Sequence, residues 1–170
     1  MKRTAVDISA CASEINEHLK KGVFLTTKAG NRTNSMVIGW GHVGRVWERP
    51  VFVAYVRRSR FTRELLDQNP EFTVNVPVNG FKPDAFAVCG SKSGRDVDKF
   101  AVTGLTLTEP EVISVPGIKE YPLTLECRVI YRQEQELSLI PDDIMKQFYQ
   151  DGDSHVMYFG EIKACYRIGD

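Results

Sequence analysis

The spacing of apolar residues at the start of the chain is helical. Between residues 6 and 19, apolar side chains recur three and four positions apart, which predicts a short amphipathic helix with one buried face. The residues on that face are Ile8, Cys11, Ala12, Ile15 and Leu19. From Val23 onward the pattern changes to short β-branched and aromatic runs separated by turn residues, which is typical of strands.

The first half of the chain is predicted to form strands and one further helix. A turn at Ala29-Gly30-Asn31 joins the first two strands into an antiparallel hairpin. The helix has Thr62 as its N-cap and ends before Pro70, because proline disfavours helical geometry in the residue before it. The predicted strands are residues 23–28, 35–42, 49–56 and 71–77, and the helix is residues 62–68.

The second half continues the pattern of strands with short helices. Residues 123–132 alternate apolar and polar positions from Leu123 to Tyr131, as a half-buried antiparallel strand does. Two other strands are predicted at 112–114 and 160–167, and short helices at 84–88 and 96–100. Many short strands with few helices predict a mainly β fold, a closed or nearly closed antiparallel barrel.

Composition narrows the class of protein. A chain of 170 residues without an internal repeat or flexible linker is expected to be one domain over residues 1–170. No apolar run reaches the roughly 20 residues of a membrane-spanning helix, and no apolar stretch follows the basic start as in a secretion signal, so we expect a cytoplasmic protein without membrane contact.

Charge and cysteine spacing exclude other classes. The chain has 22 basic and 22 acidic residues, so it lacks the basic field that drives general nucleic-acid binding. The four cysteines form no C-x-x-C pair, and neither His18 nor His42 has a second ligand at i+4. No metal site is therefore predicted, and the cysteines are interpreted as buried free thiols.

A basic, hydroxyl-rich segment lies at the junction of a predicted strand and helix. It reads Arg57-Arg58-Ser59-Arg60-Phe61-Thr62. Free backbone N–H groups and the helix dipole favour an anion there by roughly 0.3–1 kcal/mol. Arginines can add charge-assisted hydrogen bonds to a phosphate, which makes the segment a candidate phosphate site. A solvated basic turn with an ordinary N-cap fits these residues equally well.

A polar tract at the start of the return strand is the candidate partner for a ring system. It reads Asn34-Ser35-Met36-Val37, with Trp40 and Trp47 nearby. Backbone groups at such a strand end can meet the line of donors and acceptors along an isoalloxazine edge. Taken alone, the tract is better explained as the flank of a β-turn with a core tryptophan.

His155 is the histidine best placed for chemistry. Polar turn residues precede it and an apolar run follows it, so it can stand at the mouth of a pocket and approach a nicotinamide or a flavin edge. Its local sequence fits a surface turn at least as well. The motifs of serine hydrolases, P-loop NTPases and zinc proteases do not occur in the chain.

In their order and spacing, these segments resemble the flavin reductase-like family, which has the FMN-binding split-barrel fold, and more particularly its short flavoredoxin-type members. The similarity runs from about Gly22 to Lys163. Besides the two segments above, it is carried by Phe72-Thr73-Val74-Asn75-Val76-Pro77, by residues 89–100 from Cys89 to Phe100, by Gly104-Leu105, and by His155 with Gly160-Glu161.

The resemblance implies an antiparallel, Greek-key-like split β-barrel and a homodimer with FMN at or near the interface. It implies that Asn34, Ser35, Met36 and Val37 flank the isoalloxazine, that Arg57, Ser59, Arg60 and Thr62 hold the phosphate, that Cys89, Gly90 and Ser91 border the cofactor, that Lys99 is a phosphate partner, and that His155 stands on the nicotinamide side. The arginine cluster is richer than is usual in the family, so which arginine meets the phosphate stays open.

Two functions are compatible with the resemblance. In an NAD(P)H-dependent flavin reductase, the nicotinamide delivers a hydride to flavin N5, and the protein contributes position and electrostatics. In a flavoredoxin-like carrier, tightly bound FMN exchanges electrons with a protein partner without direct use of NAD(P)H. A barrel that stores or senses flavin or a haem-like ligand is a third alternative. NADH or NADPH as reductant, FMN as prosthetic group or substrate, and the electron acceptor all stay open.

Overall fold

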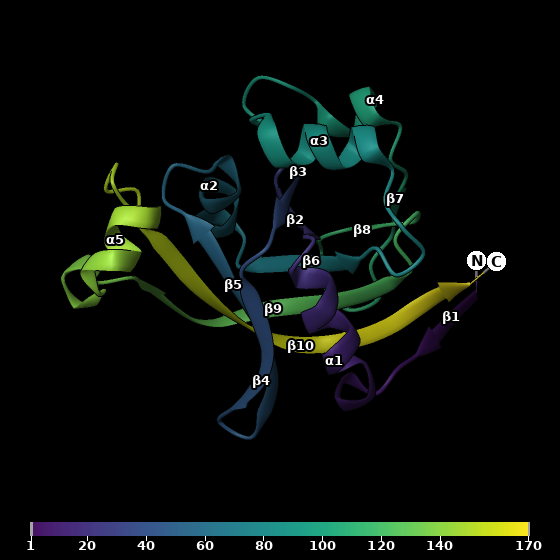
Figure 1. Ribbon diagram of the computed structural model, residues 1–170. Coiled ribbons are helices and arrows are strands. Elements are labelled where there is room, and N and C mark those ends of the chain that lie inside the picture. The colour runs from purple at the N-terminus through teal and green to yellow at the C-terminus, as the bar shows by residue number, and fades with distance from the viewer. Residues whose placement is uncertain (1, 170) are drawn as a thin grey trace.

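Antiparallel pairing organises the chain, of which the computed structural model describes residues 2–169. The main sheet has the strand order β3-β2-β6-β9-β10-β5-β4, with β1 added along β10, and β7 and β8 form a separate pair (Figure 1). The strands are β1 (Lys2–Ala5), β2 (Val23–Ala29), β3 (Arg32–Ile38), β4 (Gly41–Val46), β5 (Arg49–Arg57), β6 (Glu71–Val76), β7 (Leu107–Thr108), β8 (Gly117–Ile118), β9 (Leu123–Glu134) and β10 (His155–Gly169).

Short helices lie around this sheet. In Figure 1, α3 and α4 stack above β3, α1 crosses β10, and α5 stands apart from the body at the far ends of β9 and β10. The helices are α1 (Ile8–Leu19), α2 (Phe61–Gln68), α3 (Pro83–Ser91), α4 (Lys99–Thr103), α5 (Asp142–Phe148) and a 3-10 turn, η1 (Leu137–Leu139). Among the described residues, no helix has both the length and the apolar composition needed to cross a membrane.

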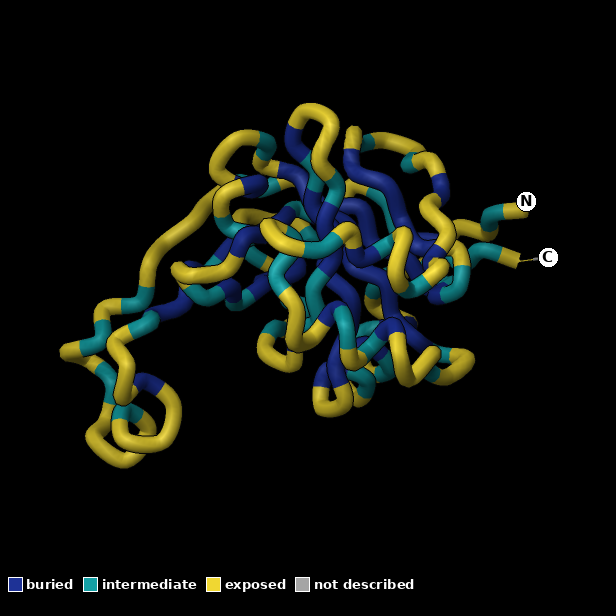
Figure 2. The backbone as a smooth tube through the Cα atoms, turned by 90° about the horizontal axis from the view of Figure 1, so that it is seen from above, coloured by how far each residue is buried: buried dark blue, intermediate teal, exposed yellow. Residues whose placement is uncertain are grey.

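The core lies where the strands curve over one another. Phe24, Phe52 and Phe72 are fully buried, each on a different strand. Gly160 of β10 permits this packing, because a Cβ there would collide with the ring of Phe72. Figure 2 shows the buried residues concentrated in the body, while the projecting segment that carries α5 is mostly exposed.

Several predicted boundaries change. The first strand of the hairpin, β2, ends at Ala29, one residue later than predicted. Its return strand, β3, runs over Arg32–Ile38 instead of residues 35–42. Gly41 and His42 belong instead to β4, which pairs with β5 and was not predicted. The predicted N-cap is also wrong: Arg60 occupies that position, without a side-chain cap, and Thr62 lies inside α2.

The strand predicted at residues 112–114 does not form. The backbone N–H groups of Glu111, Val112 and Ile113 donate to the carboxylate of Glu126 instead of a neighbouring strand, at 2.7–3.2 Å. Ser114 donates to Glu71 in the same way at 2.7 Å. The buried carboxylates of Glu126 and Glu71 thus satisfy the backbone N–H groups of residues 111–114, so these groups do not pair with a strand.

Candidate functional site

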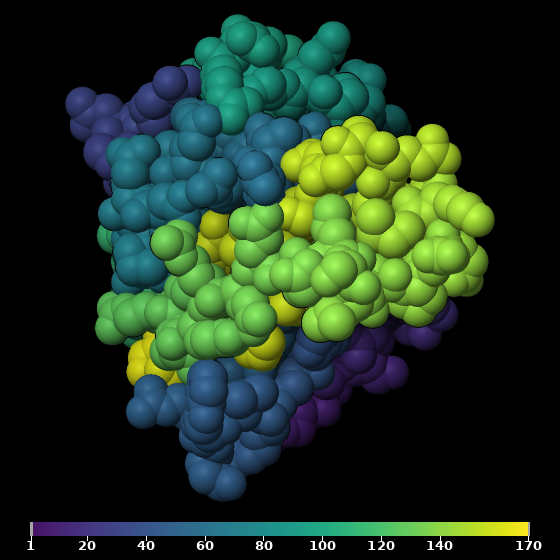
Figure 3. All heavy atoms as spheres, turned by 90° about the vertical axis from the view of Figure 1, so that its left-hand side faces the viewer, coloured from purple at the N-terminus to yellow at the C-terminus, as the bar shows by residue number. Residues whose placement is uncertain are grey.

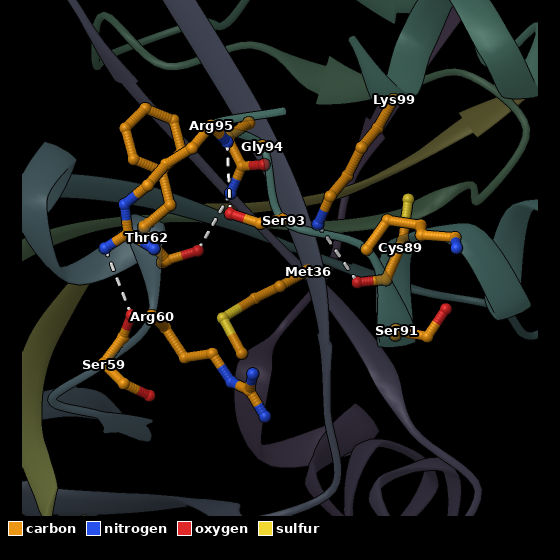
Figure 4. Close-up of a pocket in the computed structure, with 14 residues that line it drawn as sticks. Met36, Ser59, Arg60, Thr62, Cys89, Ser91, Ser93, Gly94, Arg95 and Lys99 are labelled. Atoms are coloured by element: carbon orange, nitrogen blue, oxygen red, sulfur yellow. Dashed lines mark hydrogen bonds between the residues drawn. The ribbon is translucent and has the colours of Figure 1, made fainter. Parts of the chain in front are cut away.

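Two adjoining pockets lie between β3, the start of α2, the end of α3 and the start of β10. They share Met36 and Arg60. The first pocket, drawn in Figure 4, is lined by Asn34, Met36, Ser59, Arg60, Phe61, Thr62, Cys89, Gly90, Ser91, Lys92, Ser93, Gly94, Arg95 and Lys99. The second is lined by Met36, Val37, Ile38, Gly39, Trp40, Tyr55, Arg57, Arg60 and His155.

Strand β3 forms the floor that the two pockets share. It is an edge strand of the sheet, so its backbone polar groups on the side away from β2 have no sheet partner. Side chains alternate along it: Asn34 and Met36 line the first pocket, whereas the Ser35 hydroxyl faces inward and lies 3.2 Å from that of Thr26. Ser35 therefore reaches the site only through its backbone carbonyl.

Lys99 brings a buried positive charge to the first pocket. It is 4% exposed, and its Nζ donates to the carbonyl oxygens of Ser35 at 2.8 Å and Cys89 at 3.2 Å. Burial lowers the pKa of Lys99, the Cys89 thiol partly opposes this, and the nearby Arg60 adds to it. No ion pair among residues 2–169 includes Lys99 or Arg60. Two cations without a carboxylate partner make this pocket suited to an anion.

Asn34 supplies a polar atom without a partner. Its side chain is 3% exposed, and its amide donates to the Thr62 hydroxyl at 2.9 Å, but its Oδ1 is buried and accepts no hydrogen bond. A Cβ at Gly94 would collide with this Oδ1, so only glycine lets the loop after α3 pass so close. The oxygen is therefore enclosed beneath Gly94, and the side chain of Asn34 is held in place by Thr62 at the edge of the first pocket.

The loop between α3 and α4 adds residues that were not among the predicted site residues, although they lie in the segment 89–100 that carries the family resemblance. Arg95 donates to the backbone carbonyl of Ser59 at 3.1 Å and pairs with Glu64 on α2. The guanidinium groups of Arg95 and Arg32 lie over the Phe61 ring, at 5.6 and 4.5 Å. Figure 4 shows Ser93, Gly94 and Arg95 facing the start of α2 across the pocket. The run Ser93-Gly94-Arg95 was the sequence feature from which this part of the pocket could have been predicted.

The three arginines of residues 57–60 point to different parts of the structure. Arg60 faces both pockets. The Arg57 guanidinium turns toward the α5 segment, where it donates to the carbonyl oxygens of Asp153 at 2.8 Å and Phe148 at 2.9 Å, and it lines only the second pocket. Arg58 lines neither pocket and pairs with Glu134 at 3.0 Å. Of the three arginines, Arg60 alone lines the anion-suited pocket.

Ser59 and Thr62 are both engaged with protein groups. The Ser59 hydroxyl and backbone N–H donate to the Asp153 carboxylate, at 2.6 and 3.1 Å. Thr62 is buried and accepts from Asn34. A phosphate can take the Ser59 donors only by displacing Asp153, and their contact with a ligand stays a prediction.

The end of α3 closes the other side of the first pocket. Cys89 is buried, and burial raises the pKa of its thiol while the charge of Lys99 opposes the rise. The Ser91 hydroxyl donates to the Ala87 carbonyl at 2.7 Å. A Cβ at Gly90 would lie in ordinary contact with Val37, which places this turn directly beside β3.

His155 lies in an aromatic setting in the second pocket. The Trp40 and His155 rings have centroids 4.8 Å apart at an interplanar angle of 36°. Burial, followed by the nearby charge of Arg57, lowers the pKa of His155 to about 4, so the ring is neutral at neutral pH. Trp47, in contrast, sits on the β4–β5 turn, against Tyr131 and outside both pockets.

The site and fold define the class of the protein. The fold is mainly β, with an antiparallel sheet and a few short helices, and it resembles FMN-binding flavin reductase-like barrels. The flavin reductase like domain model matches residues 17–170, and the chain belongs to the flavin reductase-like family, with its FMN-binding split-barrel fold.

Similar proteins agree with this family. The chain is 29% identical to the flavoredoxin of Methanosarcina acetivorans, with a TM-score of 0.64 over 86% of this chain and 68% of that one. An FMN-binding domain of a flavin reductases-like enzyme from Shewanella baltica has a TM-score of 0.68 at 18% identity, over 98% and 77% of the two chains. The uncharacterized protein YddH of Escherichia coli is 34% identical over 58% of this chain and 52% of its own length. The chain spans about half the length of the curated relatives it matches.

The residues present fit FMN. A phosphate needs positive charge, which Lys99 and Arg60 provide. A ring system needs an apolar contact and free backbone groups, which Met36 and the edge strand β3 supply.

Proposed function

We propose that this protein is an NAD(P)H-dependent FMN oxidoreductase, with the phosphate in the first pocket and the ring over β3 toward the second. The supporting observation is the buried Lys99, which lines the first pocket together with Arg60 and forms no ion pair with a carboxylate among residues 2–169. Burying a cation without a counter-charge is unfavourable, which argues for an anionic occupant.

The chain's own residues bind and orient in this proposal. FMN, when bound, supplies the acceptor for a hydride and the donor of electrons to a second substrate. Lys99 and Arg60 balance the phosphate charge, and Asn34 lines the same pocket. Trp40, Tyr55 and His155 form the wall against which a nicotinamide ring can lie, and the neutral His155 adds no charge there. The site thus works by placement, without a nucleophile.

The test is titration of the purified protein with FMN, followed by anaerobic addition of NADH or NADPH. We expect a retained or tightly titrating flavin that loses its absorbance within seconds of adding the nicotinamide. Lys99→Met should weaken FMN binding by about tenfold or more, because a charge-assisted hydrogen bond is worth about 1.5–3 kcal/mol. Lys163→Met is the matched control, since Lys163 pairs with Glu161 on β10 outside both pockets. Equal FMN affinity in the two folded variants would contradict the proposal.

The second candidate is a flavoredoxin-like electron carrier with tightly bound FMN. The 29% identity to a flavoredoxin over most of the chain favours it. The same anaerobic experiment separates the two: a carrier keeps its absorbance with NADH and NADPH, and loses it only when a reduced partner protein is added.

We further propose that the protein is a homodimer with the FMN site near its interface. The segment carrying α5 supports this, because it lies beside two residues of the second pocket, Trp40 and Arg57, and exposes apolar side chains, among them Leu139 at 80% exposure. Figure 3 shows this segment, in light green, on the surface of the molecule. Light scattering on the purified protein should give twice the chain mass. Leu139→Asp should reduce that mass, and a monomeric wild type would contradict the proposal.

A further inference from the structure

A chain of hydrogen bonds connects the projecting segment to His155. Gln135 follows β9, Tyr149 follows α5, and His155 opens β10. The Tyr149 hydroxyl lies 2.8 Å from Gln135 Oε1 and 3.0 Å from His155 Nδ1. The backbone N–H of His155 also reaches Gln135 Oε1, at 3.3 Å. The sequence pattern singled out neither Gln135 nor Tyr149.

The hydrogen bonds that join Gln135, Tyr149 and His155 allow only one assignment of donors and acceptors. A backbone N–H can only donate, so the Gln135 atom that faces it must be the carbonyl oxygen. That oxygen cannot donate, so the single hydroxyl proton of Tyr149 goes to it. The Tyr149 oxygen must then accept, and His155 Nδ1 is its donor. A neutral imidazole with its proton on Nδ1 has a free lone pair on Nε2.

The free nitrogen belongs to a side chain that lines the second pocket. No hydrogen-bond partner meets Nε2 within the described part of the chain. It is not sealed in the interior either, because the fully buried side-chain atoms without a partner belong to Thr27, Asn34 and Tyr158. His155 lines the pocket together with Trp40 and Tyr55, so an acceptor nitrogen stands in an aromatic wall.

We infer that Gln135 and Tyr149 are positioning residues that hold His155 as a hydrogen-bond acceptor toward the second pocket, which selects a planar ring carrying an N–H donor. The choice of ligand rests on the proposed function, which offers two such donors, the carboxamide of a reduced nicotinamide and the imide of the flavin ring. The tautomer itself depends only on the protein. Burial keeps the imidazole neutral, with a pKa of about 4.

The tautomer is tested first, on the ligand-free protein, by 15N NMR of the histidine rings, with His155→Asn identifying the signal. We expect the wild type to carry its proton on Nδ1. Gln135→Leu removes the acceptor, so the Tyr149 hydroxyl can turn and donate to Nδ1, which moves the ring proton to Nε2. Gln135→Glu keeps an acceptor oxygen and should keep the wild-type tautomer.

Gln133→Leu is the matched control. Gln133 lies two residues earlier and also accepts a tyrosine hydroxyl, that of Tyr131, which has no part in either pocket. This variant should leave the signal of His155 unchanged. A wild-type proton on Nε2, or an unchanged tautomer in Gln135→Leu, would overturn the inference whatever the result with FMN.

Kinetics then identify the donor. If it is the nicotinamide carboxamide, Gln135→Leu should raise KM for NADH or NADPH by about tenfold, the cost of one lost hydrogen bond, with kcat and FMN affinity nearly unchanged. If it is the flavin imide, FMN affinity should fall by a similar factor with KM unchanged. If the tautomer shifts in Gln135→Leu but neither KM for the nicotinamide nor FMN affinity changes, the proposed contact between His155 and the ligand is refuted. A wild type that binds no FMN would refute the proposed function, and the NMR result would stand.

Discussion

At the scale of single residues, the site is identified by groups that the protein leaves incompletely satisfied. Lys99 offers three N–H donors and has two carbonyl partners, and Asn34 has a buried oxygen with none. Such groups are rare in native interiors and are found mainly where a ligand completes them. Lys99 and Arg60 line the same pocket, so a single anionic ligand can contact both.

Gly94→Ala tests the close approach at Asn34. An added Cβ would meet the unsatisfied oxygen and approach the Phe61 ring to 2.9 Å, so the loop after α3 must move away from β3. We expect FMN affinity to fall by about tenfold or more, since overpacking of this kind costs about 1–3 kcal/mol. Fluorescence titration with FMN measures it. Gly44→Ala, whose Cβ would make an ordinary 3.7 Å contact on β4, should bind as the wild type does; a loss shared by both variants would refute the steric explanation.

His155 should titrate near pH 4 instead of its ordinary 6.5. Burial is the first cause, Arg57 and Arg60 also lower the pKa, Asp153 raises it, and the neutral Tyr149 faces Nδ1. Arg57→Gln removes a positive charge beside the ring, so the pKa should rise toward 6.5. NMR titration of the ring measures both values. A wild-type pKa near 6.5, or no rise in the variant, would show that the ring is more hydrated than the structure implies.

At the scale of elements, local pattern was sufficient where the elements depend on local contacts. The helical spacing before Leu19 and the alternation from Leu123 to Tyr131 both predicted real elements, α1 and β9. The run Val112-Ile113-Ser114 predicted a strand wrongly, because the carboxylates that accept its N–H groups, those of Glu126 and Glu71, lie more than ten residues away in the sequence. The α5 segment was missed because its exposed, acidic start gives no apolar periodicity.

The same limit applies to the candidate site. The polar tract at residues 34–37 and the basic turn at residues 57–62 were recognisable as continuous sequence, and the structure brings them to one pair of pockets. The division of labour among Arg57, Arg58 and Arg60 was not, because it depends on carbonyl and carboxylate groups supplied by β9 and the α5 segment. Residues that act through distant partners, such as Gln135, have no local signal.

Glu126→Gln tests the carboxylate that holds residues 111–113. Glu126 is fully buried, and its two oxygens accept three backbone N–H groups and the Tyr166 hydroxyl. An amide nitrogen in place of one oxygen would face these donors, so we expect a loss of about 3 kcal/mol in the free energy of unfolding. Denaturant unfolding measures it. Glu17→Gln, at an exposed ion pair on α1, should change stability by less than about 0.5 kcal/mol; equal effects would mean that Glu126 is not the essential acceptor.

At the scale of the whole molecule, buried or partnered titratable groups make the fold sensitive to acid. His155 has a pKa of about 4 in the folded protein, against an ordinary value of 6.5. Between these two values the unfolded chain binds one proton more than the folded chain, so the stability decreases as the pH is lowered from 6.5 to about 4. Burial alone would raise the pKa of Glu71, but hydrogen bonds from Ser114 and Arg128 outweigh it and lower that pKa. The backbone N–H of Thr106, which reaches both carboxylate oxygens, likewise outweighs burial and lowers the pKa of Glu120. Carboxylates with lowered folded pKa values stabilise the protein above 4.5 and lose that contribution as the pH falls through their folded values.

Both kinds of group therefore act in the same direction, and they separate in pH. We expect the thermal unfolding midpoint to fall in two stages, first between pH 6.5 and about 4 from His155, then below 4.5 from the glutamates. Calorimetry at a series of pH values measures the curve. His155→Asn should remove the first stage and leave the second, whereas Glu120→Gln should weaken only the second. A midpoint that stays constant from neutral pH down to about 5 in the wild type would contradict the burial of a neutral His155.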